Sequence, residues 1–260
     1  MFNLFVEMRI NLLIVMLLLL ALVAQSCRGQ VEKSIVVLTL TSDRVELAKA
    51  LSFLRSSNSK LICLNVDLSK CNQDSVDRKL IKEFNEIDSL VVSSELVPFG
   101  TGKYRDVRLF CSYFYSNHDK DGFVNLIYND ISNRIEKFKV KNIYKTKNFN
   151  NEEVDARTRY HMAVNIAFAI NSKETNKFIN SNRDTVKIDF RRKREFQTYS
   201  FGQFVEGKID KKVLEDKVVI VTSTPLDYSL VRNYESKTGE FRKMSTSEIF
   251  ANIACQILEK

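Results

Sequence analysis

The sequence predicts an α/β domain in which helices flank a mostly parallel central sheet, with an antiparallel hairpin inserted in the middle. Short apolar runs alternate with amphipathic segments in the first and last thirds of the chain, a pattern typical of βαβ units. The 260 residues include only 7 Gly and 2 Pro, which disfavours a turn-rich all-β sandwich. A hydrophobic content of 44% excludes a disordered chain.

The first third contains three apolar runs of strand length separated by two amphipathic segments. The strands are expected at residues 35–40, 61–66 and 90–92, and the helices at residues 43–56 and 77–84. Ser42 precedes the first helix, and serine is a favoured N-cap residue. Strands that alternate with helices at these spacings are joined by crossover connections, so the sheet is expected to be parallel.

The middle of the chain has a different pattern. Residues 123–129 and 134–140 predict an antiparallel pair that turns near Asn129 and Asp130, and residues 152–169 predict a long helix. The last third returns to the α/β pattern, with strands expected at residues 185–190 and 218–221 and a closing helix at 246–258. No linker, repeat or low-complexity tract divides residues 35–260, which are therefore expected to form one domain.

The N-terminus carries a targeting or anchoring segment. Residues 12–24 are an unbroken apolar run, which has the length of a signal-peptide core and is shorter than the roughly 20 residues of a spanning helix. Spanning length is reached only by including Glu7 and Arg9. Residues 1–27 are therefore expected to be a signal peptide, a lipoprotein signal or a membrane anchor, with a linker at 28–34.

The end of this segment resembles a bacterial lipobox, in which a Cys follows an apolar run and small residues. Cys27 is the candidate lipidation site, and Gln25 occupies a position where a small residue is usual. Lipidation at Cys27, an uncleaved anchor and plain secretion remain alternatives. Each of them predicts that the rest of the chain faces the extracytoplasmic side, in the periplasm or at the cell surface.

The other four cysteines are Cys63, Cys71, Cys111 and Cys255. In an oxidising compartment these four could pair in three ways. Cys63 lies in an apolar run and Cys255 on an apolar helix face, so free buried thiols are an equal alternative. The chain has no CxxC motif, which argues against a thioredoxin-like or zinc-ribbon protein.

Motifs for catalysis, metals and cofactors are incomplete. Residues 99–103 lack the Gly and the Ser/Thr of a phosphate-binding loop, and residues 117–122 lack the later bidentate acid of a calcium loop. Cys111 and His118 form the one local Cys/His pair, and no orienting acid accompanies them. We therefore expect no metal, no cofactor and no enzymatic activity, unless activity depending on Cys111 or His118 is found.

The chain is basic, with 40 Lys and Arg against 32 Asp and Glu, and its densest charge run is residues 191–194. A solvated loop is the simplest interpretation of this run. Contact with anionic lipid head groups is an alternative for a tethered domain. Nucleic acid is not an expected partner, because an exported protein seldom meets it.

Polar residues follow three of the predicted strands and form a candidate ligand site. Open α/β sheets bind ligands at the carboxyl ends of their strands. The candidate ligand-binding residues are Asn65 and Asp67, Asp189 and Arg191, and Thr222 and Ser223. The alternative is that they are ordinary capping and turn residues.

Several stretches carry a resemblance to a known family. They are residues 186–191 followed by 196–201, residues 217–221, residues 247–252, and Gly122-Phe123-Val124-Asn125 with Arg134. These stretches resemble motifs of the type-2 CHASE domain. The first matches its "INYRG" strand followed by "F-x-T-Y-S-F" and a short helix, and the second matches its "L-x-G-K-I-V-L-I-G" strand. The third matches the helix start "G-V-E-x-H-A-N", and the fourth matches the hairpin "G-x-V-N … R". From Ile35 onward, the order of segments is similar to that of this sensory extracellular family.

The chain departs from the family pattern at several strand ends. Asn65 stands where Asp is usual, Asp189 replaces the Asn of "INYRG", and Arg192 replaces its Gly. Thr222 replaces a Gly, and Phe250 replaces the His of the closing helix. If the family binds a ligand there, this chain is expected to bind a different one, or none.

The resemblance implies an extracytoplasmic sensor, which in the family is usually part of a larger receptor with a kinase or cyclase. Residues 28–260 show no second membrane segment and no output domain. We therefore expect a membrane-tethered sensory module that binds an unknown small ligand and acts through a separate membrane partner, a separately encoded kinase or cyclase being one candidate. The alternative is a non-enzymatic envelope scaffold or interaction protein that has lost the pocket.

Overall fold

The structure is a computed structural model. It describes residues 31–41, 43–68, 70, 72, 74–98, 104–108, 121–129, 134–147, 153–181, 184–190, 194–223, 228–232 and 241–259. Several of the sequence predictions lie outside these residues, namely those on residues 1–30 with Cys27, Ser42, Cys71, residues 99–103, Cys111, His118 and residues 191–193. The division of the chain at residues 27 and 34 accordingly stays a prediction.

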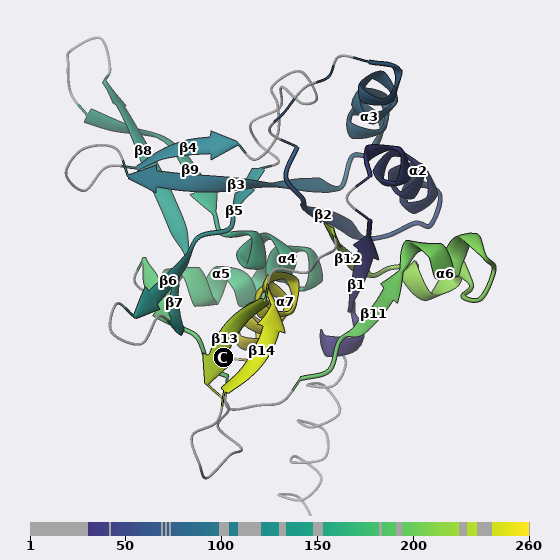
Figure 1. The fold of residues 1–260 in the computed structure, drawn as a ribbon. Helices are drawn as coiled ribbons and strands as arrows, with labels where there is room; N and C mark the ends of the chain where they lie inside the picture. Colours follow the sequence, from purple (N-terminus) through teal and green to yellow (C-terminus); the bar gives the residue numbers. More distant parts are fainter. Residues whose placement is uncertain are drawn as a thin grey trace, which may run out of the picture.

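A central sheet of seven strands organises the described part of the chain, in the order β11-β1-β12-β2-β3-β4 with β5 also paired to β3 (Figure 1). Its strands are β1 (Ile35–Leu40), β2 (Leu61–Asn65), β3 (Leu90–Pro98), β4 (Tyr104–Arg108), β5 (Asp121–Phe123), β11 (Gln197–Ser200) and β12 (Val218–Ser223). All of these pairings are parallel except the antiparallel pairing of β4 with β3. The mostly parallel α/β fold is thereby confirmed.

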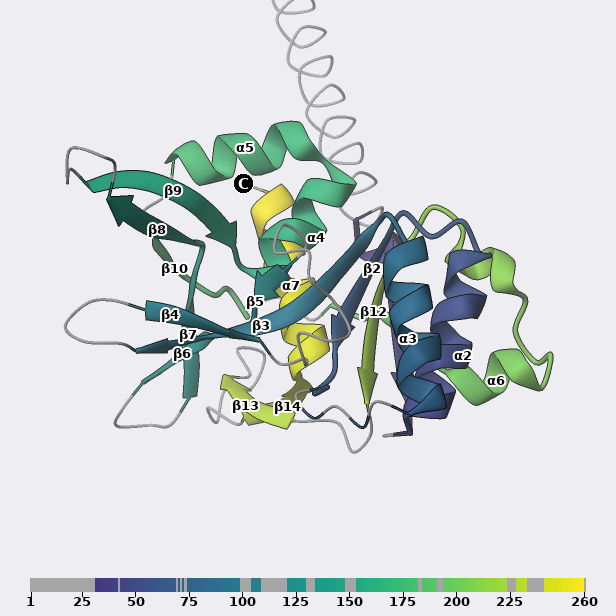
Figure 2. The same ribbon diagram turned by 90° about the horizontal axis from the view of Figure 1, so that it is seen from above.

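Helices cover both faces of the sheet, in two layers that are clearest in Figure 2. One layer contains α2 (Arg44–Arg55), α3 (Ser75–Glu86) and α6 (Phe201–Val205), and the other contains α4 (Met162–Ile170), α5 (Ser172–Ser181) and α7 (Thr246–Leu258). Successive residues of a strand point to opposite faces, so Val219 packs with the first layer and Ile220 with the second. Burial on both faces explains why these strands are continuous apolar runs in the sequence.

Three antiparallel units complete the fold. They are the sheet β10-β7-β6, with β6 (Leu126–Asn129), β7 (Arg134–Lys139) and β10 (Thr185–Lys187); the hairpin β8 (Lys141–Lys147) with β9 (Glu153–Tyr160); and the hairpin β13 (Tyr228–Arg232) with β14 (Phe241–Ser245). The predicted hairpin near Asn129 is confirmed by the β6–β7 pairing.

The predicted long helix at residues 152–169 is wrong in its first half. Residues of β9 pair with β8, and the helix α4 begins only at Met162. Two contacts explain the change. The guanidinium of Arg159 donates a 2.6 Å hydrogen bond to the buried carboxylate of Asp121, and His161 caps α4 by accepting a hydrogen bond from the amide of Ala163.

The predicted strand at residues 185–190 is shorter and lies in another sheet. Thr185–Lys187 pair antiparallel with β7, outside the parallel sheet. The chain then turns onto α7, where the amide of Asp189 donates to the side-chain oxygen of Gln256 at 2.8 Å. At the first helix, the observed N-cap is Asp43, whose carboxylate accepts from the amide of Val45.

Cys63 and Cys255 are both buried free thiols. Burial raises the pKa of Cys63 far above its ordinary value, and it raises the pKa of Cys255 to about 12. Both sulfur atoms are therefore in the protonated thiol form at physiological pH, which makes them inert packing groups rather than nucleophiles.

Candidate functional site

The site is positioned where two neighbouring strands send the chain to opposite faces of the sheet. After β2 the chain continues into α3 on one face, whereas after β12 it continues through β13 and β14 into α7 on the other. The two strands are adjacent, and Thr222 is the register partner of Asn65. In open α/β sheets, ligands bind at such a switch point, in a crevice at the carboxyl ends of the strands.

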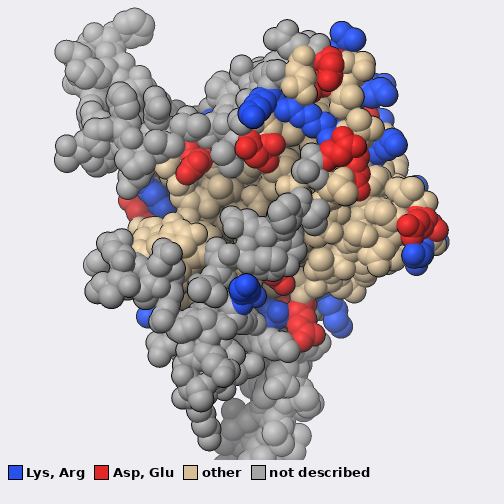
Figure 3. All heavy atoms as spheres, viewed as in Figure 1, with Lys and Arg blue, Asp and Glu red and all other residues tan. Residues whose placement is uncertain are grey.

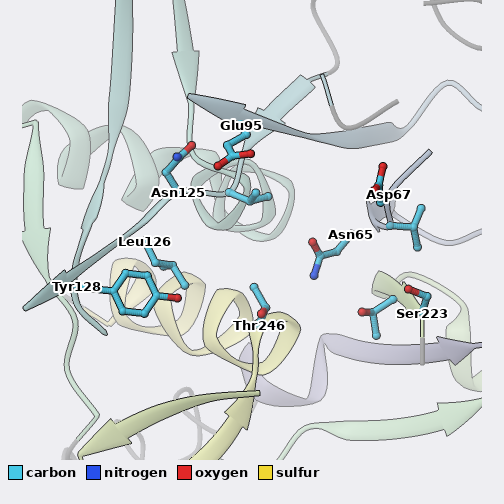
Figure 4. A pocket seen from close by; sticks show the side chains of 11 residues that line it. Asn65, Asp67, Glu95, Asn125, Leu126, Tyr128, Ser223 and Thr246 are labelled. Carbon is cyan, nitrogen blue, oxygen red and sulfur yellow. The ribbon is translucent and has the colours of Figure 1, made fainter. Parts of the chain in front are cut away.

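A pocket of about 400 Å³ lies in this crevice, a size within the range of small-molecule sites. Side chains from both sides of the crevice converge on it (Figure 4). Its described lining consists of Asn65, Val66, Asp67, Glu95, Val124, Asn125, Leu126, Tyr128, Thr222, Ser223 and Thr246.

Three polar side chains of the pocket lie on the same face of the sheet because of strand alternation. Asn65 follows Cys63 by two residues, Thr222 follows Ile220, and Glu95 follows Val91 by four. Cys63, Ile220 and Val91 belong to the core on the α7 side, so the three polar residues continue that face beyond the core. The amide of Asn65 confirms this direction by donating to the hydroxyl of Ser247 at 3.3 Å.

The amino end of α7 forms another wall of the pocket through Thr246, its first residue. Ser245 caps the helix, and its hydroxyl accepts from the amide of Glu248 at 3.2 Å. The carboxylate of Glu248 in turn accepts from the amide of Ser245 at 2.7 Å. This reciprocal capping box brings a negative charge to the positive end of the helix dipole.

Asn125 fixes the wall opposite Asn65 to the central sheet. Its side-chain oxygen accepts from the amide of Leu96 at 2.6 Å, and its side-chain nitrogen donates to the carbonyl of Leu96 at 3.0 Å. These two hydrogen bonds to β3 resemble those of a strand pairing, and they hold the loop between β5 and β6 in place. Leu126 and Tyr128 on β6 are thereby presented to the pocket.

Gly122 lets the same wall approach the helix α4 closely. A Cβ at this position would come within 3.0 Å of the side-chain amide of Asn165, of the Met162 backbone and of the Val91 side chain. Contacts that short require neighbouring atoms to move. A glycine at position 122 is therefore a packing requirement of this segment.

A buried histidine stands behind this wall. His161 is fully buried, and its ring packs edge-on against Phe123, Phe138 and Phe250 at centroid distances of 5.3 to 5.4 Å. Burial lowers the pKa of His161 from 6.5 to about 3, against a smaller opposing effect of the Asn125 backbone. The imidazole is therefore neutral at physiological pH, which suits its apolar surroundings.

Four of the six predicted site residues line the pocket, namely Asn65, Asp67, Thr222 and Ser223. Asp189 does not line it, because β10 belongs to the antiparallel sheet and the chain after it contacts the other half of α7. There the carbonyl of Asp189 accepts from the side chain of Asn252 at 3.1 Å. Arg191 lies outside the described residues.

Several lining residues were not predicted from the sequence, chiefly Glu95, Leu126, Tyr128 and Thr246. A signal for Thr246 was present, since Ser245 and Glu248 have the spacing of a capping box and mark a helix start. Glu95 gave a weaker signal, as a charged residue three positions after the apolar run that ends at Val92. Leu126 and Tyr128 lie two residues apart on a hairpin strand, and no local pattern indicates which pocket that strand faces.

The two charged residues of the described lining are both acidic. Asp67 and Glu95 are both exposed and contribute carboxylates, whereas no Lys or Arg occurs among the described lining residues. On the face of the molecule in Figure 3, basic and acidic side chains are interspersed rather than gathered in one large basic patch.

The family model of the CHASE2 domain matches residues 16–260, which is nearly the whole chain. The chain belongs to the CHASE2 domain family. Comparison with curated proteins and with solved structures finds no significant match. CHASE2 domains are extracytoplasmic sensory modules and not catalytic domains, so the family assigns this chain a sensory role.

Two further observations bear on this CHASE2 domain. Within the described ranges, no helix has both the length and the apolarity that a membrane span needs. The same residues contain no group of three or more His, Cys, Asp or Glu side chains arranged to hold a metal ion.

Proposed function

We propose that this CHASE2 domain is a membrane-tethered sensor that binds a small molecule in the pocket between β12 and β2 and passes the signal to a separate membrane partner. The tether is residues 1–27, with Cys27 as the lipidation site or the segment retained as an anchor. The ligand-binding residues are Asn65, Asp67, Thr222 and Ser223, joined by Glu95 and Tyr128.

One observation carries this proposal. The pocket lies at the switch point of a parallel sheet, where α/β folds bind their ligands, and polar side chains from three strands and the amino end of α7 converge on it. A scaffold that had lost its pocket would have filled this crevice with large apolar side chains. Here Thr222 and Ser223 are small and polar at its edge.

The helix α7 supports a route from the pocket to the tethered end of the domain. Its 13 residues span about 20 Å, from Thr246 at the pocket to Leu258. Near its carboxyl end, the guanidinium of Arg194 donates to Asn252 at 2.6 Å and to Glu259 at 2.8 Å. The same guanidinium pairs with Glu32 at 3.5 Å.

Glu32 lies only five residues after Cys27, so this cluster joins α7 to the segment that follows the proposed tether. A ligand that binds better to one position of α7 than to another would shift the equilibrium between those positions. The shift would reach the tether through Arg194. A membrane partner would then respond to a changed position of the tether or to a changed association between two copies of the domain.

Ligand binding is tested with the full-length chain in detergent and a panel of small metabolites that includes cations, anions and uncharged sugars. Binding is measured by ligand-observed NMR for the wild type and for Ser223→Trp, a half-buried position at the pocket edge. Val205→Trp is the matched control, because Val205 is 70% exposed on α6, away from the pocket. We expect at least one compound whose binding is abolished by Ser223→Trp and unchanged by Val205→Trp.

The proposal fails if no compound binds, or if all binding survives Ser223→Trp in a variant that unfolds at the wild-type temperature. Either result would favour the envelope scaffold as the function of this fold.

The tether is tested by the intact mass of the membrane-fraction protein after expression in a bacterial host, beside a Cys27→Ala control. A mature species that begins at Cys27 with added acyl mass supports a lipoprotein. A species that retains Met1 supports an N-terminal anchor. A soluble mature chain in both strains would contradict the tether.

A further inference from the structure

The helix layer formed by α2, α3 and α6 has two grooves on its outer side. In this layer α2 lies between α3 and α6 (Figure 2). One groove, of about 250 Å³, runs between α2 and α6, and the other, of about 260 Å³, runs between α2 and α3. Val45, which is 40% exposed, and Lys49 border both grooves and so mark the line between them. We call the surface formed by the two grooves the α2 face.

The groove between α2 and α6 is acidic. Asp43, Glu46 and Glu206 contribute carboxylates to its described lining, beside the ammonium group of Lys49. Each carboxylate has one local partner, namely the amide of Val45, the amide of Thr41 and the ammonium group of Lys208, respectively. A carboxylate has about four acceptor positions, so each of these groups can also bind a cation from another chain.

The groove between α2 and α3 is basic. Lys79 and Lys82 contribute ammonium groups to its described lining in addition to that of Lys49, and Lys82 lies 3.9 Å from the carboxylate of Glu86. The one carboxylate of the described lining belongs to Glu83, which is buried. The undescribed residues nearest in sequence to α2 and α3 carry no charge; they are Ser42, Ser69, Cys71 and Gln73.

A surface with one acidic and one basic side can bind a second copy of itself. In a two-fold symmetric contact, the same surface of each copy meets that of the other. An axis parallel to α2 places the acidic groove of each copy against the basic groove of the other, and the two α2 helices lie parallel. An axis in the contact plane perpendicular to α2 would place acid against acid and base against base. The charges therefore favour the parallel arrangement.

The direction of α2 in the fold favours the same axis. β1 and β2 run in the same direction in the sheet, so α2, which joins them, returns the chain to the edge at which β1 begins. The carboxyl end of α2 therefore lies at the edge where residues 31–34 enter the fold. An axis parallel to α2 leaves the N-terminal ends of both copies on one side, as attachment to a single membrane requires.

We propose that the α2 face binds a second copy of this chain in a two-fold symmetric dimer with parallel α2 helices. Lys79 and Lys82 of each copy face Glu46 and Glu206 of the other, and Val45 lies near its own counterpart at the axis. Only the argument from the shared membrane rests on the proposed function, because the charges of the two grooves are independent of the tether and of the ligand pocket.

Charge reversal in the full-length chain in detergent tests this contact by sedimentation velocity. Lys79→Glu/Lys82→Glu makes both grooves acidic, and Glu46→Lys/Glu206→Lys makes both basic. Each variant alone should dimerise about tenfold more weakly than the wild type, because like charges then oppose each other. An equimolar mixture of the two variants should recover most of the wild-type affinity, since each acidic copy then meets a basic one.

The matched control is Lys137→Glu/Lys187→Glu. It makes the same change in net charge as the α3 variant, on two exposed lysines that are register partners in the antiparallel sheet. This sheet lies on the opposite side of the molecule from α2 (Figure 1), so the control should dimerise within about twofold of the wild type. A mixture of the two reversed variants that stays monomeric, or a control that weakens dimerisation equally, would overturn the proposal.

A cysteine near the axis tests the geometry by a second measurement. The proposed axis brings residue 45 of the two copies together, so Val45→Cys should form a disulfide-linked dimer under oxidising conditions. Lys187→Cys is the control, and the wild type gives the background of the native cysteines. A chain that associates without cross-linking through position 45 above this background would overturn the parallel arrangement.

The dimer and the ligand pocket can fail separately, because the pocket lies on the α7 side of the sheet. A wild-type chain that stays monomeric, or a dimer that no variant of the α2 face weakens, would overturn this inference and leave ligand binding as proposed. Ligand binding that is insensitive to Ser223→Trp would overturn the proposed pocket and leave the dimer as proposed.

Discussion

The two ends of α7 both meet polar groups, but these groups are in opposite situations. At the carboxyl end, the Arg194 side chain is 3% exposed and is bound by Asn252, Glu259 and Glu32. At the amino end, Asp67 and Glu95 are exposed around a pocket. The helix α7 thus connects a buried ionic cluster at its carboxyl end to an open pocket at its amino end.

This difference distinguishes polar groups that stabilise the fold from polar groups that are accessible to a ligand. A buried charge is tolerated only when its partners surround it, so the cluster at Arg194 must be complete for the domain to fold. Exposed carboxylates are hydrated and can be changed with little loss of stability. Substitutions at the carboxyl end should therefore affect folding, and substitutions at the amino end should affect binding.

The largest expected effect is that of Arg194→Ala. Removing the guanidinium breaks the buried hydrogen bonds of Arg194 to Asn252 and Glu259, which should lower the free energy of unfolding by about 3–5 kcal/mol. The control is Lys208→Ala, whose ion pair with Glu206 lies at the surface, with an expected loss below about 1 kcal/mol. Urea unfolding measures both, and equal losses would remove the distinction between the two kinds of polarity.

The second effect concerns His161, whose ring packs on Phe250 in the middle of α7. The unfolded chain binds a proton at this residue near pH 6.5, whereas burial lowers the pKa of the folded histidine to about 3. The unfolded state therefore binds more protons as the pH falls through this range, and stability decreases. Between pH 6.5 and about pH 4.5 the loss from this residue should be about 2 kcal/mol.

The variant His161→Asn tests this expectation, because asparagine does not titrate and still caps a helix. It should be less stable than the wild type at neutral pH, since the smaller side chain leaves a cavity. Its urea midpoint should nevertheless fall less between the two pH values. An unchanged pH dependence would mean that other groups cause the acid sensitivity.

The smallest effect is expected from Ser245→Ala at the amino end of α7. The substitution removes the hydroxyl that accepts from the amide of Glu248, and losing such a cap costs about 1 kcal/mol. Thermal and urea unfolding should show a loss well below that of Arg194→Ala. A loss of similar size would mean that the pocket end of the helix is as essential to folding as the ionic cluster.

The sequence predicted the elements whose signals are local. The strands β1, β2 and β12 are continuous apolar runs, and α7 has both helical periodicity and a capping box. The pocket residues Asn65 and Thr222 followed from the general rule that ligands bind at the carboxyl ends of parallel strands. These predictions needed no knowledge of contacts between distant segments.

The wrong predictions depended on such distant contacts. Residues 153–160 are a strand because they pair with β8 and because Arg159 bonds to Asp121, 38 residues away. Asp189 was assigned to the pocket because an apolar run predicts a strand but does not identify its sheet. The pairing of β10 with β7 gives that information, and local sequence does not contain it.

The most direct test of the binding site is amide hydrogen exchange of the full-length chain, with and without the tightest-binding compound of the panel. Amides are slowed where a ligand stabilises local structure against opening. We expect slower exchange at residues 65–67 and 222–223 and in the first turn of α7. Protection confined to segments outside the pocket, with no change at residues 65–67 or 222–223, would contradict it.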